Sequence, residues 1–579
     1  MKDKDVIARR KEWPVIGLIC VAIYAYIVRL LHLLDHGYYY VISPDSYFFH
    51  WQARQLLQGA SIPMSWHSGM TYPIAYASRV FSAVCGASTD QSLRWASVLL
   101  PPVMAVVSIF LLYWVVSRVF DPRVAFFYAF AWAAAPFPIV TQGAGYLDRD
   151  GLSVIIITAG AFLFYLSSHW RVKVLGVDFG WLLATAALGG VEILLYLEWV
   201  WLGPVLLLAI ISFTWAADVL FGVARGVAPR LSERELDVMT IPGSIASVFP
   251  SALKSSRWRP LVALLLLNAV VAAKLGIISG MASSLRLALP TLTGSGVTAE
   301  LRGISLGDLL AYNVLLVALL VGLAIGLKRL GRADSFAIGW FAGLFGGALF
   351  IGRLLPYADP AICLLVGVGL GYLLDIRGLS YSSLRASVAL ADPQTLKYVR
   401  VAAGMILILL SLAYSFMYGY RATQVPAASA DRDWQEALLY LRDNSSPQAV
   451  VMCHWTYGYF VRDLADRETL EDNGNWDEAR NADVALAYTD NDPAQVAAIM
   501  ARRGLDYFIF SADDYFLLPA VTKDAFGESY GDGNSIPPEV RNSVYARSLF
   551  GDFISGGGLQ RIYPDASVDR PRVVILALQ

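Results

Sequence analysis

Long apolar runs, repeated along the first 420 residues, limit how this chain can fold more than any other feature. Each run has about 17 to 25 residues, which lets a helix cross about 30 Å of hydrocarbon. We place the runs at these ranges: 14–34, 95–117, 124–141, 152–168, 177–192, 194–215, 260–282, 309–327, 335–352, 357–375 and 401–418. They predict a polytopic α-helical membrane protein with about eleven spans, or about thirteen if a long run hides an extra pair.

The composition agrees with this class of protein. Of the 579 residues, 57% are hydrophobic and only 16% are charged, whereas soluble globular domains carry about 25% charged residues. A soluble protein of this length is therefore excluded. The net charge of −1 argues against nucleic-acid binding, which needs a basic face. The four cysteines are scattered and form neither a disulfide framework nor a zinc site.

The positions of Lys and Arg predict the orientation in the membrane. Basic residues precede the first span, and they also fill the connections 118–123, 171–173, 216–259, 328–332 and 377–400. Because Lys and Arg are enriched in cytoplasmic loops, we expect a cytoplasmic N-terminus in a multi-pass protein of the cell (plasma) membrane. An odd number of spans then places the residues after Tyr420 outside the cytoplasm.

From about Arg421 the composition becomes that of a soluble domain. Charged residues become more frequent, and no later run is long enough to span a membrane. Apolar periodicity predicts amphipathic helices at 434–442 and 493–503 and short buried strands at 449–452 and 507–510. We therefore predict two domains, a multi-span domain at 1–420 and an extracytoplasmic mixed α/β domain at 421–579.

Four carboxylates and one arginine fall at the predicted outer surface of the membrane. Asp45 follows the first span, Asp148 and Asp150 end the connection after the third span, and Glu300 lies in the loop after the seventh. Arg353 follows the ninth span. The predicted topology rests only on apolar runs and on basic loops, yet it places all five on the side of the soluble domain.

Carboxylates that converge near a membrane repel one another unless a cation neutralises them. An all-oxygen ligand set suits Mg²⁺ or Mn²⁺ rather than zinc. The guanidinium of Arg353 could bind phosphate oxygens in a bidentate manner. Each feature alone also fits an ordinary role, since an Asp-x-Asp pair often lies in a solvated turn and an arginine at a helix end often anchors the helix at the interface.

Taken in order, these motifs resemble the catalytic subunits of oligosaccharyltransferases, namely the single-subunit archaeal and bacterial enzymes and their eukaryotic counterpart. The matching elements are the Asp of the first external loop (Asp45), a Gly-aromatic element followed by Asp-x-Asp (Gly145 to Asp150), a Thr-x-Glu element (Thr298 to Glu300) and an Arg followed by aromatic and Pro (Arg353 to Pro360). The family signature Trp-Trp-Asp-Tyr-Gly is matched in a divergent form by His454-Trp455-Thr456-Tyr457-Gly458.

The resemblance implies a glycosyltransferase of the GT-C type, with the catalytic residues in 1–420. Such an enzyme moves an oligosaccharide from a polyprenyl (pyro)phosphate carrier to protein asparagine, with inversion at the anomeric carbon. By resemblance, the metal site with Mn²⁺ or Mg²⁺ consists of Asp45, Asp148, Asp150 and Glu300, Arg353 binds the donor phosphate, and the catalytic residues are Asp45, Glu300 and Arg353. The acceptor peptide would bind at His454, Trp455, Thr456 and Tyr457. The implied partners are the lipid-linked donor, the acceptor protein and the bilayer, and a single subunit would suffice.

One departure from the family pattern keeps other functions open. Thr456 stands where relatives have the Asp that selects the hydroxyl at the +2 position of Asn-x-Ser/Thr, and a neutral, shorter group should weaken or alter that selection. An Asp-x-x-Lys element is not clear around 513–516. The same donor could serve another acceptor (a different sequon, a hydroxyl or water), or the chain could be a non-catalytic paralogue or a transporter. His454 and Trp455 could also simply close a core turn, and we interpret His50 and His67 as packing or interfacial residues.

Overall fold

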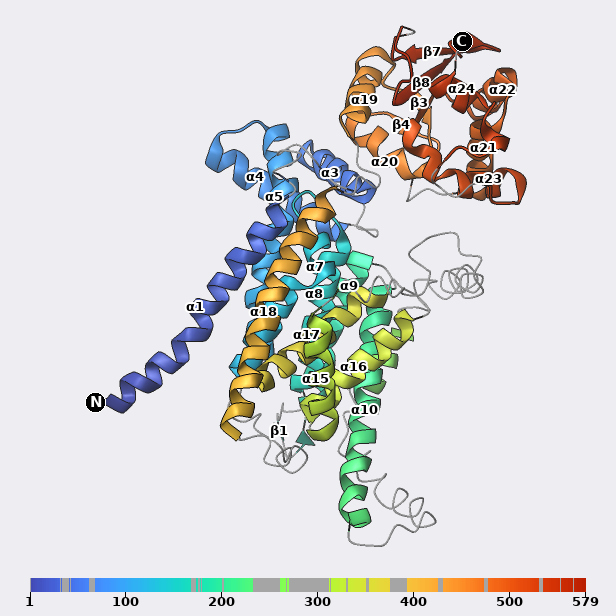
Figure 1. Cartoon of the computed structure of the whole chain (residues 1–579). Coiled ribbons are helices and arrows are strands. Elements are labelled where there is room, and N and C mark those ends of the chain that lie inside the picture. Colours follow the sequence, from blue (N-terminus) through green and yellow to red (C-terminus); the bar gives the residue numbers. More distant parts are fainter. Residues whose placement is uncertain are drawn as a thin grey trace.

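The computed structural model (Figure 1) describes these residues: 2–31, 33, 41, 43–61, 68–167, 173–174, 177–178, 180–199, 202–232, 261–266, 268–269, 312, 314–329, 332–349, 354–374, 393–424, 431–472, 477–530, 535–551, 553–565 and 567–579. Up to residue 424 the described elements are helices, apart from one two-stranded hairpin. The remainder combines a sheet with helices.

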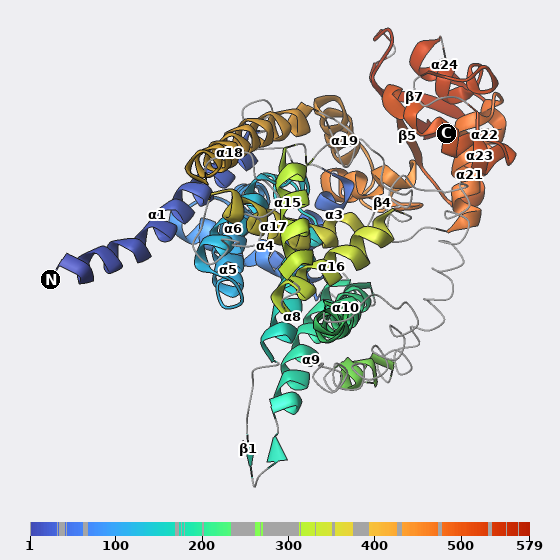
Figure 2. The ribbon, with the colours of Figure 1, turned by 60° about the horizontal axis from the view of Figure 1, so that its bottom comes forward.

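Helices of different lengths make up the N-terminal part, and most of them form a bundle (Figures 1 and 2). They are α1 (Lys2–Leu30), α3 (Pro44–Leu57), α4 (Ser68–Cys85), α5 (Thr89–Val116), α6 (Pro122–Ala134), α7 (Pro136–Thr141), α8 (Arg149–Ser167), α9 (Gly180–Trp199), α10 (Leu202–Ser232), α15 (Leu315–Arg329), α16 (Arg332–Ala348), α17 (Leu355–Leu373) and α18 (Pro393–Gln424). The hairpin β1 (Lys173–Val174) and β2 (Val177–Asp178) precedes α9.

Four of the described helices are long and apolar enough to cross a membrane: Thr89–Val116, Gly203–Ala224, Leu355–Leu373 and Lys397–Arg421. Shorter apolar helices cover Val15–Leu30, Asp150–Leu166 and Leu182–Leu195. The predicted run 124–141 is two helices, because the extended residue Ala135 and the following Pro136 separate α6 from α7. Of the predicted run 260–282, only 261–266 and 268–269 are described.

Helix α17 lies at the centre of this bundle, with all residues from Tyr357 to Gly371 buried. It approaches α15 backbone to backbone at Gly322 and Gly369, where an added Cβ atom would collide with carbonyl oxygens of the other helix. Close approach through small residues is the usual packing of helices in a membrane. The contact anchors the C-terminal half of α17, whereas Tyr357 lies in the first turn of that helix.

Two helices in the first external connection were not predicted. Helices α3 and α4 occupy residues that we treated as a loop, and Figure 1 shows them at the end of the bundle nearest the C-terminal part. The segment forming α3 has no long apolar run, since His50, Gln52 and Arg54 interrupt it. Its apolar residues instead join a core that includes Trp434, Tyr457 and Phe460.

The C-terminal part is a six-stranded mixed sheet in the order β4-β3-β5-β8-β7-β6. The strands are β3 (Val450–Met452), β4 (Glu468–Thr469), β5 (Tyr507–Ser511), β6 (Ser555–Gly556), β7 (Leu559–Tyr563) and β8 (Val573–Leu578). β3 pairs in parallel with β4 and β5, and the remaining pairs are antiparallel. The helices are α19 (Arg432–Asn444), α20 (Gly458–Phe460), α21 (Glu478–Thr489), α22 (Pro493–Arg503), α23 (Leu518–Phe526) and α24 (Val544–Phe550). Short turns complete this part: η5 (Trp455–Tyr457), η6 (Val461–Ala465), η7 (Ala512–Phe516) and η8 (Pro538–Val540).

Both faces of this sheet are buried, because successive side chains of a strand point to opposite faces. Met452, Phe508 and Phe510 join one core with α21 and α24. Val451, Cys453 and Ile509 join a second core, which contains residues of α19, α20 and α3. The predicted mixed α/β domain is confirmed. The predicted division at residue 420 falls near the end of α18, and the assignment of two domains stays a prediction.

Candidate active site

Ser46 joins two of the predicted site segments. Its hydroxyl donates to the carbonyl oxygen of Leu147 (3.0 Å) and accepts from the Leu147 amide (2.8 Å), although the two residues are 101 positions apart. Asp45 immediately precedes Ser46, in the first turn of α3, and Asp148 immediately follows Leu147. The buried hydroxyl therefore holds the segments of the two predicted carboxylates together.

Asp148 and Asp150 lie at the start of α8. The Asp148 side chain caps the helix, since its Oδ1 accepts from the Asp150 amide (3.1 Å). Oδ1 of Asp150 accepts from the hydroxyl of Tyr357 (3.2 Å), a residue that is 1% exposed. The carbonyl oxygen of Tyr357 in turn accepts from the indole of Trp340 (2.9 Å). The first turn of α17 therefore contacts the Asp-x-Asp element. Tyr357 is the aromatic residue of the Arg353 to Pro360 motif, but sequence reasoning assigned it no role.

Three residues singled out in the sequence, His67, Glu300 and Arg353, lie outside the described residues. Within the described ranges, no group of three or more His, Cys, Asp or Glu side chains forms a candidate metal site. The four-carboxylate ligand set with Glu300 stays a prediction, and so does the phosphate-binding role of Arg353.

The motif His454 to Gly458 begins directly after β3. His454 caps the turn η5 (Trp455–Tyr457), and its Nδ1 accepts from the Thr456 amide (3.3 Å) and lies 2.8 Å from the Thr456 hydroxyl. Burial lowers the pKa of His454 to about 3, so the ring is neutral at physiological pH. Because Nδ1 accepts from the amide, it carries no proton, and the Thr456 hydroxyl must donate to it. The Thr456 oxygen thus offers lone pairs to an incoming donor.

The side chain of Tyr457 forms a hydrogen bond with the segment that follows β5. Its hydroxyl donates to Oδ1 of Asp514 (2.7 Å), and Tyr488 donates to Oδ2 (2.9 Å). Asp514 also completes a capping box with Ser511, the sequence signal that could have revealed it. Desolvation raises the pKa of Asp514 to about 6, although these hydrogen bonds act in the opposite direction.

Gly458 ends the motif at a point of close approach. A Cβ atom there would collide with the carbonyl oxygen of Glu471 and with Asp472. The next residues form α20, which packs on α3, with the rings of Tyr47 and Phe460 4.6 Å apart. The segment of Asp148 and the end of the predicted acceptor element therefore both contact α3, the helix that carries Asp45.

No family model matches the chain, but parts of its sequence are similar to known proteins. The chain is 25% identical over 285 residues to the dolichyl-diphosphooligosaccharide–protein glycosyltransferase subunit stt-3 of Caenorhabditis elegans, covering 41% of this chain and 36% of that protein. It is 26% identical over 220 residues to dolichyl-phosphooligosaccharide-protein glycotransferase 2 of Pyrococcus furiosus, covering 37% and 25%. The matches thus span about a third or less of the relatives' length.

Solved structures match over nearly the whole chain. The archaeal oligosaccharyltransferase AglB of Archaeoglobus fulgidus, described in complex with an inhibitory peptide and a dolichol-phosphate, has a TM-score of 0.68 at 16% identity, covering 96% of this chain and 80% of that one. Its apo form has a TM-score of 0.68 at 15% identity.

The fold defines the class first: like AglB, the chain combines a bundle of apolar helices with a C-terminal mixed α/β domain, as predicted. The sequence matches then confirm the predicted resemblance to the catalytic-subunit family of oligosaccharyltransferases. The equivalence of His454 to Gly458 with the family signature stays a prediction.

Proposed function

We propose that this chain is an oligosaccharyltransferase that transfers an oligosaccharide from a polyprenyl (pyro)phosphate carrier to the asparagine of a protein acceptor. The observation that carries the proposal is the joining of the Asp45 and Asp148 segments by Ser46, on the helix that also contacts the acceptor element. The AglB structure described with an inhibitory peptide and a dolichol-phosphate supports a peptide acceptor and a lipid donor.

The proposal includes an orientation and a stoichiometry. The protein resides in the cell membrane with its N-terminus in the cytoplasm, and its C-terminal domain meets acceptor proteins outside. The excess of Lys and Arg in alternate connections supports this orientation. A single chain suffices for transfer, since the candidate donor and acceptor segments are all part of it.

In this proposal Asp45, Asp148 and Asp150 hold a divalent ion together with Glu300. These residues offer only carboxylate oxygens, which fits Mn²⁺ or Mg²⁺. An AglB structure described as a complex with Zn and sulfate supports a divalent cation and an anion in a protein of this fold. The ion would supply Lewis-acid polarisation of the leaving phosphate. Tyr357 would orient Asp150 through its hydrogen bond.

The chain's own groups would act on the two substrates. Asp45 and Glu300 would accept hydrogen bonds from the acceptor amide nitrogen and raise its nucleophilicity. Arg353 would hold the phosphate oxygens by charge-assisted hydrogen bonds and stabilise their charge as the carrier leaves. Attack from the face opposite the phosphate would invert the anomeric carbon.

The acceptor hydroxyl would meet Thr456. His454 Nδ1 accepts a hydrogen bond from the Thr456 hydroxyl, so the Thr456 oxygen would accept from the Ser or Thr at the +2 position. Trp455 would flank this position, and the buried Tyr457 would support the element through its hydrogen bond to Asp514. An uncharged acceptor oxygen forms a weaker hydrogen bond than a carboxylate does, and this favours a second candidate function. In that function the donor is the same and the acceptor is a less selective sequon, a hydroxyl or water.

A transfer assay on the purified chain in detergent tests the proposal. It supplies lipid-linked oligosaccharide, Mn²⁺ and an Asn-x-Thr peptide, and compares the wild type with Asp45→Ala and with chelator. Glycopeptide formed only by the wild type with metal supports the proposal. Donor consumption without glycopeptide supports the second candidate. Absence of both donor binding and turnover would indicate a non-catalytic paralogue or a transporter.

A further inference from the structure

One face of α3 contacts the C-terminal part from Tyr47 to Arg54. Tyr47, His50, Trp51 and Arg54 recur at the spacing of a single helix face. The ring of Phe48, at the edge of this face, lies 4.6 Å from the ring of Tyr459. These contacts fall on α20 and η6 (Val461–Ala465), the segment that directly follows the acceptor element.

At the centre of this contact is a buried ionic cluster. Nδ1 of His50 donates to Oδ1 of Asp463 (2.8 Å), and Nη2 of Arg54 lies 3.1 Å from the same oxygen. Arg54 also donates to the Asp463 carbonyl oxygen (2.5 Å). The side chains of His50 and Asp463 are only 5% and 1% exposed. A cluster buried this deeply tolerates little change in geometry, because removing one partner leaves an unpaired polar group.

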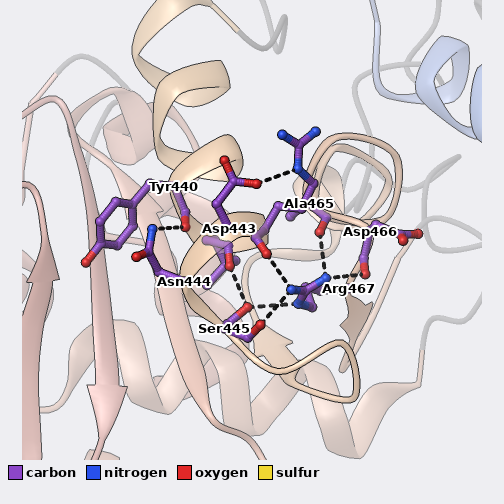
Figure 3. Close-up of polar contacts among 9 residues, drawn as sticks. Tyr440, Asp443, Asn444, Ser445, Ala465, Asp466 and Arg467 are labelled. Atoms are coloured by element: carbon purple, nitrogen blue, oxygen red, sulfur yellow. Dashed lines mark hydrogen bonds and ion pairs between the residues drawn. The ribbon is translucent and has the colours of Figure 1, made fainter. Parts of the chain in front are cut away.

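The turn that carries Asp463 is itself anchored (Figure 3). Arg467 donates to the carbonyl oxygens of Ala465 (3.1 Å) and Asp466 (2.9 Å) on one side. On the other side it donates to the carbonyl oxygens of Arg442 (2.6 Å) and Ser445 (2.8 Å) at the end of α19. The position of Asp463 is therefore fixed relative to the body of the C-terminal part.

Short rigid segments connect this cluster to both candidate sites. Asp45 precedes His50 by five residues of the same helix, about 7.5 Å along its axis. Gly458, which leaves no room for a side chain, precedes Asp463 by the same number of residues through α20 and η6. The position of the acceptor element relative to Asp45 thus depends on this polar contact together with the ring contacts of Tyr47 and Phe48.

We propose that His50 and Asp463 are positioning residues that hold the acceptor element in register with Asp45. The inference rests on the proposed function for its effect on transfer, and its effect on the structure is independent of it. Loss of the His50–Asp463 hydrogen bond lets the C-terminal part move relative to α3, while the Ser46–Leu147 joint and donor binding stay intact.

Three substitutions at His50 separate positioning from packing. In His50→Asn the amide nitrogen takes the place of Nδ1 and keeps the donor to Asp463. His50→Gln places its amide one bond further out, and His50→Ala removes the donor. We expect kcat/KM for the acceptor peptide to fall about tenfold or more in His50→Ala and His50→Gln, and to recover to within about threefold of wild type in His50→Asn. Donor-lipid affinity should not change.

The distance between two spin labels tests the positioning role of His50 without an activity assay. Native Cys85 on α4 is exposed, and Ala501→Cys adds an exposed site on α22, with Cys20→Ser removing the other exposed thiol. The distance distribution should be narrow in the wild type and in His50→Asn and broad in His50→Ala. Glu436→Gln, which alters an exposed ion pair on α19 (with Arg432 at 2.8 Å) and leaves both labelled helices untouched, is the control and should keep the distribution narrow.

Either of two results would overturn the inference. One is an unchanged distribution in His50→Ala. The other is equal behaviour of His50→Asn and His50→Gln, which would mean that bulk rather than the donor position matters. A wild type that transfers no glycan would contradict the proposed function instead, and the distance measurement would still decide the role of His50.

Discussion

At the residue scale, single hydroxyl groups connect the parts of the candidate site. Ser46 joins the Asp45 and Asp148 segments, Tyr357 holds Asp150, and Thr456 offers its oxygen beside Trp455. A hydroxyl can donate and accept at once, so it can satisfy a buried backbone or carboxylate group while setting its direction. Two substitutions test these roles.

Tyr357→Phe removes the donor to Asp150 without changing the shape of the core. Because partners of metal ligands orient them, we expect the Mn²⁺ affinity to fall roughly tenfold, measured by electron paramagnetic resonance of free Mn²⁺ during titration. Tyr128→Phe is the matched control, since the Tyr128 hydroxyl is buried and has no hydrogen-bond partner among the described residues. Equal Mn²⁺ affinity in both variants would contradict the role of Tyr357.

Thr456→Asp and Thr456→Val should change acceptor selection in opposite directions. A carboxylate binds a donor hydroxyl more strongly than a neutral oxygen does, so Thr456→Asp should raise the preference for Asn-x-Thr over Asn-x-Ala about tenfold. Thr456→Val keeps the shape and removes the oxygen, so that preference should disappear. The ratio of kcat/KM values for the two peptides is the measurement, and Thr456→Ser should behave as wild type. An unchanged ratio in Thr456→Val would show that the hydroxyl is recognised elsewhere.

At the element scale, α3 was missed because its pattern depends on a distant partner. His50 and Arg54 interrupt its apolar run, and both pair with the buried Asp463, more than 400 positions away. We interpreted His50 as an ordinary packing residue, and no local signal in the sequence indicates its ionic partner. The bundle helices and strands β3 and β5 were predictable, in contrast, since their apolar periodicity is local.

The turn after β5 gives a pH-dependent prediction. Burial raises the pKa of Asp514 to about 6, above its ordinary value of 3.8. The folded chain therefore binds this proton more tightly than the unfolded chain, and deprotonation as the pH rises from about 4 to about 6 lowers folding stability by up to about 3 kcal/mol. We expect the melting temperature of wild type minus that of Asp514→Asn to decrease over this window and to level off above pH 7. A difference that stays constant with pH would contradict the raised pKa.

At the scale of the whole molecule, basic loops predict that the C-terminal domain lies outside the cytoplasm. A membrane-impermeant maleimide should label Ala501→Cys in intact cells when Cys20 and Cys85 are replaced by Ser. Lys328→Cys, at the basic end of α15, should react only after permeabilisation. The reverse pattern would show that the predicted number of spans is wrong by one.

The fold could be predicted from the sequence, but the way in which the candidate site segments come together in space could not. The segments of Asp45 and Asp148 meet through Ser46, a residue that no motif singles out. Asp514 supports Tyr457 although the two are 57 positions apart. Such contacts depend on how whole elements pack, which local periodicity does not encode.

Mass spectrometry of the acceptor tests the central claim most directly. The purified chain would receive lipid-linked oligosaccharide, Mn²⁺ and an equimolar mixture of an Asn-x-Thr peptide and its Gln-x-Thr counterpart. We predict that the glycan mass appears on the asparagine of the first peptide alone, and that Asp45→Asn abolishes it. Glycan on neither peptide, with the donor consumed, or equal product from wild type and Asp45→Asn would contradict transfer to asparagine at this site.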